Sequence, residues 1–357
     1  MKKAFINIVF LALVIALSGK GFAQEAGTEL DFMNMGAGAR PAALGDAFIS
    51  LADDANSVYW NPAGLARMGT VEGTWMHSDL NFGTTFDYIS LGSPLVFGKP
   101  SKEALSKPAK DHIGFGWIRA STGDILITGI STDTIPGTNY NRVVIQGLAR
   151  FLSNAFMLSY SRQVLDRLSI GATAKMYDIE LATNDASGYG LDLGILYGSI
   201  RKTETAAECD STPAPEAKAS WYEPLSVALV INDLTITRLK WSTGYVDKIA
   251  PNVRLGLSYR LFSGRPQNSW ISSDGIALSC DIEQQVKTER QAAWHEPLYH
   301  LGVEWKAVNM LPLRAGYDNG DFACGIGFIT KHLNLDYAYK AQPELKAVHK
   351  VAITGKL

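Results

Sequence analysis

The chain has few cysteines and, beyond its first residues, no long apolar run. Its 357 residues include only three cysteines, Cys209, Cys280 and Cys324, too few and too scattered for a disulfide framework. No spacing of Cys and His is typical of a metal site, so we expect these residues to act as small apolar side chains. After the N-terminus no segment reaches the roughly 18 apolar residues that a helical membrane span needs. The formal net charge of −2 gives no basic surface for nucleic acid.

Signatures of catalysis are also missing. The sequence has no GxSxG elbow, no HExxH helix and no glycine-rich phosphate loop followed by Lys and Ser or Thr. Its six histidines are dispersed, and a hydrolase site assembled from neighbouring strands is the remaining alternative. The run Asp318-Asn319-Gly320-Asp321 offers calcium-like oxygens, but Asn-Gly favours a hairpin turn. We therefore predict a protein that is not an enzyme, with no catalytic residue, metal or cofactor.

The N-terminus has the three parts of an export signal. Lys2 and Lys3 form a basic region, Phe5 to Leu17 form an apolar core, and Gly21 and Ala23 form a small-residue cleavage site. The alternative, a single transmembrane anchor, needs a longer apolar run of about 20 residues. The sequence thus predicts a signal peptide over 1–23 and a mature chain that begins at Gln24. No cysteine lies at the cleavage site directly after the apolar core, so a lipid anchor is not indicated.

The rest of the chain is dominated by segments in which apolar and polar residues alternate, the pattern of strands with one apolar face. We count about fourteen, an even number, as bacterial outer-membrane barrels prefer. They span about 71–79, 85–93, 111–119, 152–161, 167–179, 188–199, 222–232, 252–261, 274–283, 298–306, 311–317, 322–329, 333–340 and 350–357.

The two faces of these strands differ in a way that suits a membrane barrel better than a soluble sandwich. Leu301, Leu335 and Ile353 lie on the apolar face, which also carries aromatic residues near strand ends, as in interfacial girdles. The opposite face is small or charged and is expected to line the lumen. Its charged members are His300, Glu304, Lys306, Arg314, Asp336, Lys340 and Lys350. The sequence therefore predicts an all-β fold, a transmembrane antiparallel barrel over 69–357 in an outer membrane, in contact with its lipid.

Two long connections do not fit simple barrel topology. With fourteen strands the termini share one side, and the turns on that side should be short, yet 94–110 and 200–221 are long. Either these are true periplasmic loops, or a strand has been missed within 120–150, at about Ile125 to Ile130. The loops 120–150 and 233–250 carry Tyr140, Trp241 and Tyr245, which we consider as partner contacts or as ordinary interface anchors.

Residues 31–68 break the strand rhythm and are expected to form a plug, which we place at 24–68. Asp53 or Asp54 can cap a short helix through Tyr59, and Asn61 can cap a second turn that has Pro62 at its first position. Arg40, Asp46, Asp53 and Asp54 are candidates for ion pairs between the plug and the charged lumen face. The alternative for these charges is a substrate pathway.

The same segment carries a family resemblance. Gly38-Ala39-Arg40, Leu44-Gly45-Asp46-Ala47-Phe48, Ala52-Asp53-Asp54-Ala55 and Tyr59-Trp60-Asn61-Pro62-Ala63-Gly64-Leu65 resemble the N-terminal signature of the PorV/PorQ family of outer-membrane proteins. That family is similar to the FadL long-chain fatty acid transporters. The match covers about 30 residues, and the strand pattern extends it. The chain ends in Leu357, where barrels of this sort usually end in Phe.

The resemblance implies two functions of different classes. The first, which the nearest signature favours, is a type IX-like secretion or surface-assembly component that binds exported cargo proteins or other secretion components. The second is a FadL-like passive transporter with a hydrophobic small molecule as its partner. In the transporter, Phe48, Ile49, Tyr59 and Trp60 would line an apolar pocket. The candidate residues for ligand or plug contact are Arg40, Phe48, Ile49, Asp53, Asp54, Tyr59, Trp60 and Asn61.

Overall fold

The computed structural model describes eight parts of the chain. They are residues 31–95, 109–134, 141–198, 224–261, 275–286, 296–308, 310–342 and 346–357. The predicted signal peptide at 1–23, the expected start at Gln24, and Cys209 and Tyr140 lie outside them. No helix among the described residues is long and apolar enough to cross a membrane.

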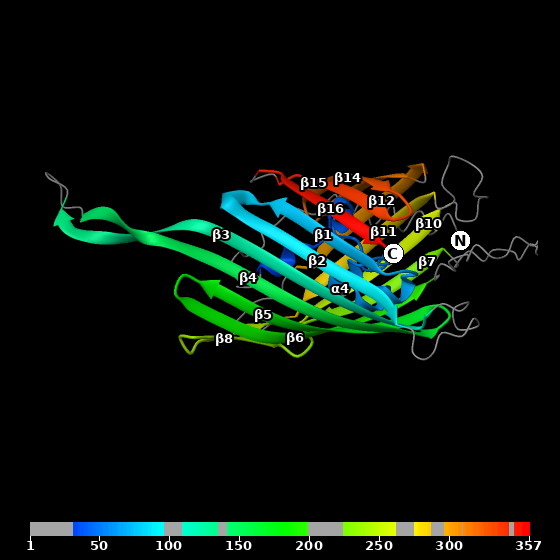
Figure 1. Ribbon diagram of the computed structural model, residues 1–357, viewed down its shortest axis with the longest axis horizontal. Coiled ribbons are helices and arrows are strands. Elements are labelled where there is room, and N and C mark those ends of the chain that lie inside the picture. The colour runs from blue at the N-terminus through cyan, green and yellow to red at the C-terminus, as the bar shows by residue number, and fades with distance from the viewer. Residues whose placement is uncertain are drawn as a thin grey trace, which may run out of the picture.

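Antiparallel strands make up most of the described chain (Figure 1). The first seven are β1 (Glu72–Asp79), β2 (Thr84–Leu95), β3 (Asp111–Thr134), β4 (Asn141–Leu165), β5 (Leu168–Leu181), β6 (Asn184–Gly198) and β7 (Leu225–Asn232). A hairpin of β8 (Thr237–Trp241) and β9 (Val246–Ile249) follows. The last seven are β10 (Asn252–Leu261), β11 (Ile276–Gln285), β12 (Leu298–Val308), β13 (Leu311–Asp318), β14 (Asp321–Ile329), β15 (Leu333–Lys340) and β16 (Val348–Lys356).

The sheet closes on itself as a barrel of fourteen strands, which confirms the predicted fold class and strand number. Each strand pairs with its neighbour in sequence, β1 pairs with β16, and β7 pairs with β10 across the β8–β9 hairpin. The hairpin adds to the end of β6 through Ala186 and Ser187 and stands outside the barrel count. The turn at Asn319 and Gly320, both with positive φ, joins β13 to β14 as the Asn-Gly pair predicted.

The two long connections follow β2 and β6, on the side of the barrel where β16 ends, and Ile125 to Ile130 form no separate strand. Residues 96–110 and 199–224 join strand ends at the end of the barrel where β16 finishes and β1 starts. The suggested strand at Ile125 to Ile130 is wrong, because these residues extend β3, which is 24 residues long and pairs with a 25-residue β4. We call the end of the barrel where β1 begins and β16 ends the terminal end, and the opposite end the far end.

The alternation of the strands sorts side chains between an apolar outside and a filled inside. Leu335 and Ile353 are exposed on the outer surface, whereas Glu304, Asp336 and Lys350 are buried in the lumen, as predicted. Leu301 is a correction: it shares the outward side but is only 7% exposed, because it lies between Cys280 and Tyr317 on the flanking strands. The outer surface is therefore suited to hydrocarbon and the inside to polar contacts.

An arginine scan tests this assignment of faces. Ile353→Arg should lower the free energy of unfolding by roughly 2–4 kcal/mol, because a guanidinium would enter the hydrocarbon layer. Asn334→Arg, on the lumen side of the adjacent β15, should cost clearly less. Urea titration of the two variants folded in lipid vesicles measures the difference. Equal costs at both positions would contradict the assignment.

The plug elements occupy the lumen (Figure 1). They are α2 (Asp31–Asn34), α3 (Ala39–Ala43), α4 (Ser57–Trp60) and the 3₁₀ turn η1 (Pro62–Arg67), while a further short turn, η2 (Asn81–Gly83), joins β1 to β2. Helix α3 packs against β13 to β16, and η1 packs against β2 to β6. The plug thus bridges opposite walls of the barrel.

Glycines on the lumen face let the plug backbone touch the wall. A Cβ on Gly316 would lie 2.0 Å from the Gly45 nitrogen, and one on Gly302 would lie 2.7 Å from the Leu44 oxygen. Gly45 itself has a φ of +60°, which favours glycine. The small residues of this face therefore leave room for the plug backbone.

Candidate functional site: the plug and the lumen

Local capping fixes the shape of the plug. Asn61 has an extended φ of −160° and precedes Pro62, and its Oδ1 accepts a hydrogen bond from Ala63 N at 3.0 Å. Its Nδ2 donates to the Ile49 backbone oxygen at 2.9 Å, which ties η1 to the preceding loop. Asn61 is therefore the cap that the sequence predicted, and it is fully buried.

The short helix before Asn61 is capped less directly than expected. Asp54 Oδ1 accepts a hydrogen bond from Asn56 N at 2.9 Å, so this carboxylate closes the turn that leads into α4. The N-cap residue of α4 is Asn56, whose side chain makes no capping bond, and the helix runs to Trp60 rather than Tyr59. Of the two proposed caps only Asp54 binds the local backbone. Asp53 points its carboxylate elsewhere, toward arginines.

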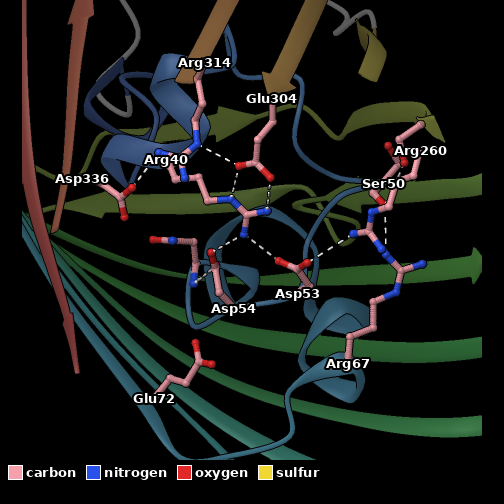
Figure 2. Close-up of polar contacts among 12 residues, drawn as sticks. Arg40, Ser50, Asp53, Asp54, Arg67, Glu72, Arg260, Glu304, Arg314 and Asp336 are labelled. Atoms are coloured by element: carbon pink, nitrogen blue, oxygen red, sulfur yellow. Dashed lines mark hydrogen bonds and ion pairs between the residues drawn. The ribbon is translucent and has the colours of Figure 1, made fainter. Parts of the chain in front are cut away.

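Arg40 is the centre of a network of charges that joins the plug to the wall (Figure 2). Its guanidinium contacts Asp53 at 2.6 Å and Asp54 at 2.8 Å within the plug, and Glu304 of β12 at 3.0 Å. Glu304 also binds Arg314 of β13 at 2.8 Å, and Arg314 binds Asp336 of β15 at 2.6 Å. The chain of contacts alternates in sign, so each buried charge has an opposite neighbour.

Three further contacts hold the plug at other points. Asp53 reaches Arg260 of β10 at 3.3 Å, and Asp46 lies 3.5 Å from Lys340 of β15, which also pairs with Asp318. Lys350 of β16 donates to the backbone oxygen of Gly36 at 2.7 Å. Of the two roles considered for the lumen charges, locking the plug to the wall accounts for these contacts. The sequence analysis proposed Asp46, Asp53, Lys340 and Lys350 for such contacts without their pairing, and it did not include Arg260.

The charges set the protonation of the plug residues. Burial raises the pKa of Asp53, but the nearby Arg40 and Arg260 outweigh it, so this pKa lies well below its ordinary value. For Asp54 burial prevails and raises the pKa. Burial and the positive charge of Arg260 lower the pKa of Arg67 to about 9, while its Nη atoms donate to Ser50 O and Ser226 Oγ, each at 3.0 Å. The contacts of Arg67 thus join the plug to β7.

The aromatic residues proposed for a ligand pocket are packed inside the plug. Phe48 and Trp60 meet edge to face at 6.3 Å, and both are buried together with Ile49 against apolar residues of β6, β7 and β11. Trp60 Nε1 donates to Ala37 O at 2.7 Å. Tyr59 is only partly buried and lies 6.4 Å from the ring of Tyr88. Of the four candidates, Tyr59 is the one whose side chain is only partly buried, and it packs between the two apolar clusters.

Around Tyr59 the inward side chains of the barrel form an apolar wall that the sequence analysis did not predict. Side chains of β1 to β5 point inward there and are buried against one another and the plug. They are Met76, Phe86, Tyr88, Ile118, Met157, Tyr177 and Ile179. Trp241 and Ile249 of the β8–β9 hairpin pack against the same cluster. A usable signal was the loss of alternation in β2 and β3, where both faces are apolar, as at Tyr88 beside Ile89 and Trp117 beside Ile118.

A second polar cluster fixes the base of the β8–β9 hairpin. Lys175 of β5 lies 2.7 Å from Asp192 of β6 and 3.6 Å from Asp233, which follows β7 with a φ of +51°. Thr237 Oγ1 and Tyr177 OH donate to Asp233 at 2.7 and 3.1 Å. The chain leaving β7 is thus anchored to the wall, which sets the hairpin beside the apolar lumen lining.

Metal and cysteine chemistry have no candidate among the residues that the structure describes. No group of three or more His, Cys, Asp or Glu side chains there could hold a metal ion. Cys280 and Cys324 are free thiols on the outward side of β11 and β14.

Three solved structures are similar to this chain. The Pseudomonas putida toluene transporter TodX aligns with a TM-score of 0.51 and 12% identity over 90% of this chain and 98% of its own. A deltaS2 mutant of the TodX monoaromatic hydrocarbon channel gives 0.50 and 14% over 90% and 97%. A Pseudomonas aeruginosa FadL homologue gives 0.47 and 11% over 90% and 97%. The TodX alignments show a shared fold.

Comparisons at the level of sequence give no family. No protein-family model matches the chain, and no curated protein matches it. The likeness to TodX shows the fold alone, so the resemblances to PorV/PorQ and to the FadL transporters stay predictions.

Proposed function

We propose that this protein is an outer-membrane channel for the passive uptake of hydrophobic small molecules. The observation that supports the proposal is the apolar wall built from inward side chains of β1 to β5, which packs against the plug. These side chains are 0–1% exposed in this structure, so a solute would reach them when the plug shifts. Barrels that pass polar solutes have polar interiors, because water and solute need hydrogen-bonding partners. An apolar lining instead provides a surface on which an apolar solute can leave water. The TodX fold agrees with this role.

In this proposal one half of the lumen wall anchors the plug and the other half contacts the solute. The charged half, on β10 to β16, holds the plug through Arg40, Asp46 and Asp53. The apolar half, on β1 to β5, is bordered by Tyr59 of the plug and by the β8–β9 hairpin. A solute entering at the far end would follow the apolar half down to the plug. No step of this pathway needs a covalent change, a metal or a cofactor.

The alternative favoured by the sequence signature is a secretion or surface-assembly component that binds exported proteins at its outer loops. Nothing in the comparisons supports that role. The β8–β9 hairpin, in the predicted 233–250 loop, presents Tyr245 at its exposed surface and would be the contact in this case. The lumen lining gives the transport proposal the stronger physical basis.

Uptake by matched variants tests the proposal. Ile118→Asn places an amide in the apolar wall and should reduce uptake of toluene and oleate at least tenfold, because the solute would lose apolar contact there. Ile113→Asn, the same change on the outward face of the same strand, should leave uptake within about twofold. Uptake is measured in cells with equal amounts of folded barrel, shown by heat-modifiable gel migration.

A different result would favour the secretion role. If Ile118→Asn leaves uptake unchanged, while the native protein purified in mild detergent retains an exported protein and substitutions in the β8–β9 hairpin release it, the transport proposal is wrong. A fatty acid or aromatic compound bound to the purified barrel, with no protein partner, would support transport.

A further inference from the structure

Strands β3 and β4 continue far beyond the barrel as a two-stranded ribbon. The last contact of β3 with β2 is at Thr122, and the last contact of β4 with β5 is at Phe151. The described residues past these points, 123–134 and 141–150, form strand pairs only with each other, and at the foot of the ribbon Arg150 O accepts a hydrogen bond from Ala182 N at 3.0 Å. At ~3.3 Å per residue the ribbon extends about 40 Å. Figure 1 shows it projecting from the far end, past all neighbouring strands.

The two faces of this β3–β4 ribbon differ in composition. The register pairs Leu126 with Leu148, Thr128 with Ile145, and Ile130 with Val143, so these side chains share one face. Its five large aliphatic residues are 57 to 74% exposed: Leu126, Ile130, Val143, Ile145 and Leu148. We call this the ribbon outer face, because the pairing continues the outward side of β3 and β4 from the barrel.

The opposite face is smaller and better covered. Ile125 and Ile127 are 37 and 40% exposed, and they lie across from Ala149 and Gly147. Gln146 sits in a bulge, and its amide lies against Gly129 on this side. The apolar surface of the ribbon is therefore concentrated on the outer face, which points away from the barrel axis.

An exposed face of this kind is unusual for a free hairpin. An isolated two-stranded ribbon is marginally stable in water, and exposed strands normally carry lysine, proline or inward charges that prevent association. In 123–131 and 142–150 the charged residues are Asp124, Arg142 and Arg150, and no proline or lysine occurs. The ribbon outer face therefore has the composition of a surface that is covered by another polypeptide.

We propose that the ribbon outer face binds the same face of a second copy of this protein. Two barrels in one membrane project their ribbons in the same direction and to the same height. A twofold axis along the membrane normal then brings the two outer faces together, with β3 of one copy over β4 of the other. Ten aliphatic side chains form a small two-layer core, as in packed sheets.

Charge at the foot of the ribbon fits this arrangement. Asp124 on β3 and Arg150 on β4 lie at the same level, within the bulge between the Thr122–Phe151 and Ile125–Ala149 pairs, and both are exposed. Because the twofold axis places β3 of one copy over β4 of its partner, Asp124 of one copy meets the partner's Arg150, and the reverse. The face is thus complementary to itself in both its apolar and its charged parts.

Cross-linking in membranes tests the proposal on the full chain. In a variant with Cys209, Cys280 and Cys324 replaced by alanine, Ile145→Cys should give a dimer with a short bis-maleimide. Val144→Cys, the next residue and on the opposite face, should give at least tenfold less. Ile145→Asp should then convert the dimer seen by native mass spectrometry in mild detergent to a monomer, with heat-modifiable migration showing that the barrel still folds.

Three outcomes would overturn the inference. The first is equal cross-linking at the two positions, or none at either. The second is a product whose mass identifies another protein, which would make the ribbon outer face a site for a different partner. The third is strong quenching of a fluorophore at position 145 by lipids labelled on their tails, which would mean that lipid covers this face.

Discussion

Replacing Arg40 with methionine should be among the most damaging single changes to this barrel. Among the residues that the structure describes, Arg40 is the one side chain that contacts Asp53, Asp54 and Glu304 together. Loss of one member of a buried ion network costs about 3–5 kcal/mol, because the partners stay buried without compensation. We expect about 3 kcal/mol, since Asp53 is 28% exposed and keeps Arg260 while Glu304 keeps Arg314. Urea titration of the barrel in lipid vesicles measures the loss.

The control for this variant is an arginine in an exposed pair. Arg162→Met removes a contact of 3.4 Å with Asp111, but the Arg162 side chain is 55% exposed, so the cost should be about 0–1 kcal/mol. Arg40→Met should also raise ion conductance in planar bilayers, because the plug loses its contact with β12. A cost for Arg40→Met no larger than that for Arg162→Met would show that the network does not hold the plug.

The barrel was accessible from the sequence because membrane strands obey a strict period. Lipid on one side and a filled lumen on the other force alternation, so Leu335 and Asp336 could be assigned to opposite faces without a structure. The cap at Asn61 could likewise be predicted, because Asn is favoured at the N-cap and Pro at the first position of a helical turn. Local rules of this kind do not depend on which strand lies next to which.

The content of the lumen depends on tertiary neighbours and was harder to predict. The sequence named Arg40, Glu304 and Arg314, but only strand order brings β12 and β13 beside α3 and so makes a network of them. The apolar wall was missed because Phe86 and Tyr88 place apolar side chains on the inward face, which was expected to be small or charged. The extension of β3 and β4 was missed because a free ribbon has no second wall to set its register.

Different residues of the lumen are expected to control the stability of the barrel and the uptake of solutes. The ion pairs that hold the plug lie on β10 to β16, whereas β1 to β5 contact the plug mainly through the apolar wall. A substitution in the first set should change the free energy of unfolding and the leak of ions. A substitution in the second should change uptake of apolar solutes with a smaller effect on leak. Measuring both quantities for each variant distinguishes the two roles.

Gly316→Ala should displace the plug although it adds a single methyl group. The new Cβ would lie 2.0 Å from the Gly45 nitrogen and 2.2 Å from the Leu44 carbonyl carbon. Both are backbone atoms, so no side-chain rotation can relieve the overlap. Overpacking usually costs about 1–3 kcal/mol, and a contact between two backbones should lie at the upper end. The plug should therefore shift away from β13, with loss of stability and a rise in ion conductance.

Two matched glycines make this prediction specific to the plug contact. A Cβ on Gly123 or Gly147 meets nothing within 4 Å, so Gly123→Ala and Gly147→Ala should leave stability within about 0.5 kcal/mol and conductance unchanged. Deleting the plug residues 31–68 should give the same open conductance as Gly316→Ala if plug displacement is the cause. If Gly316→Ala keeps both the stability and the low conductance of the native barrel, the plug does not pack against β13 through Leu44 and Gly45, and the wall glycines have another purpose.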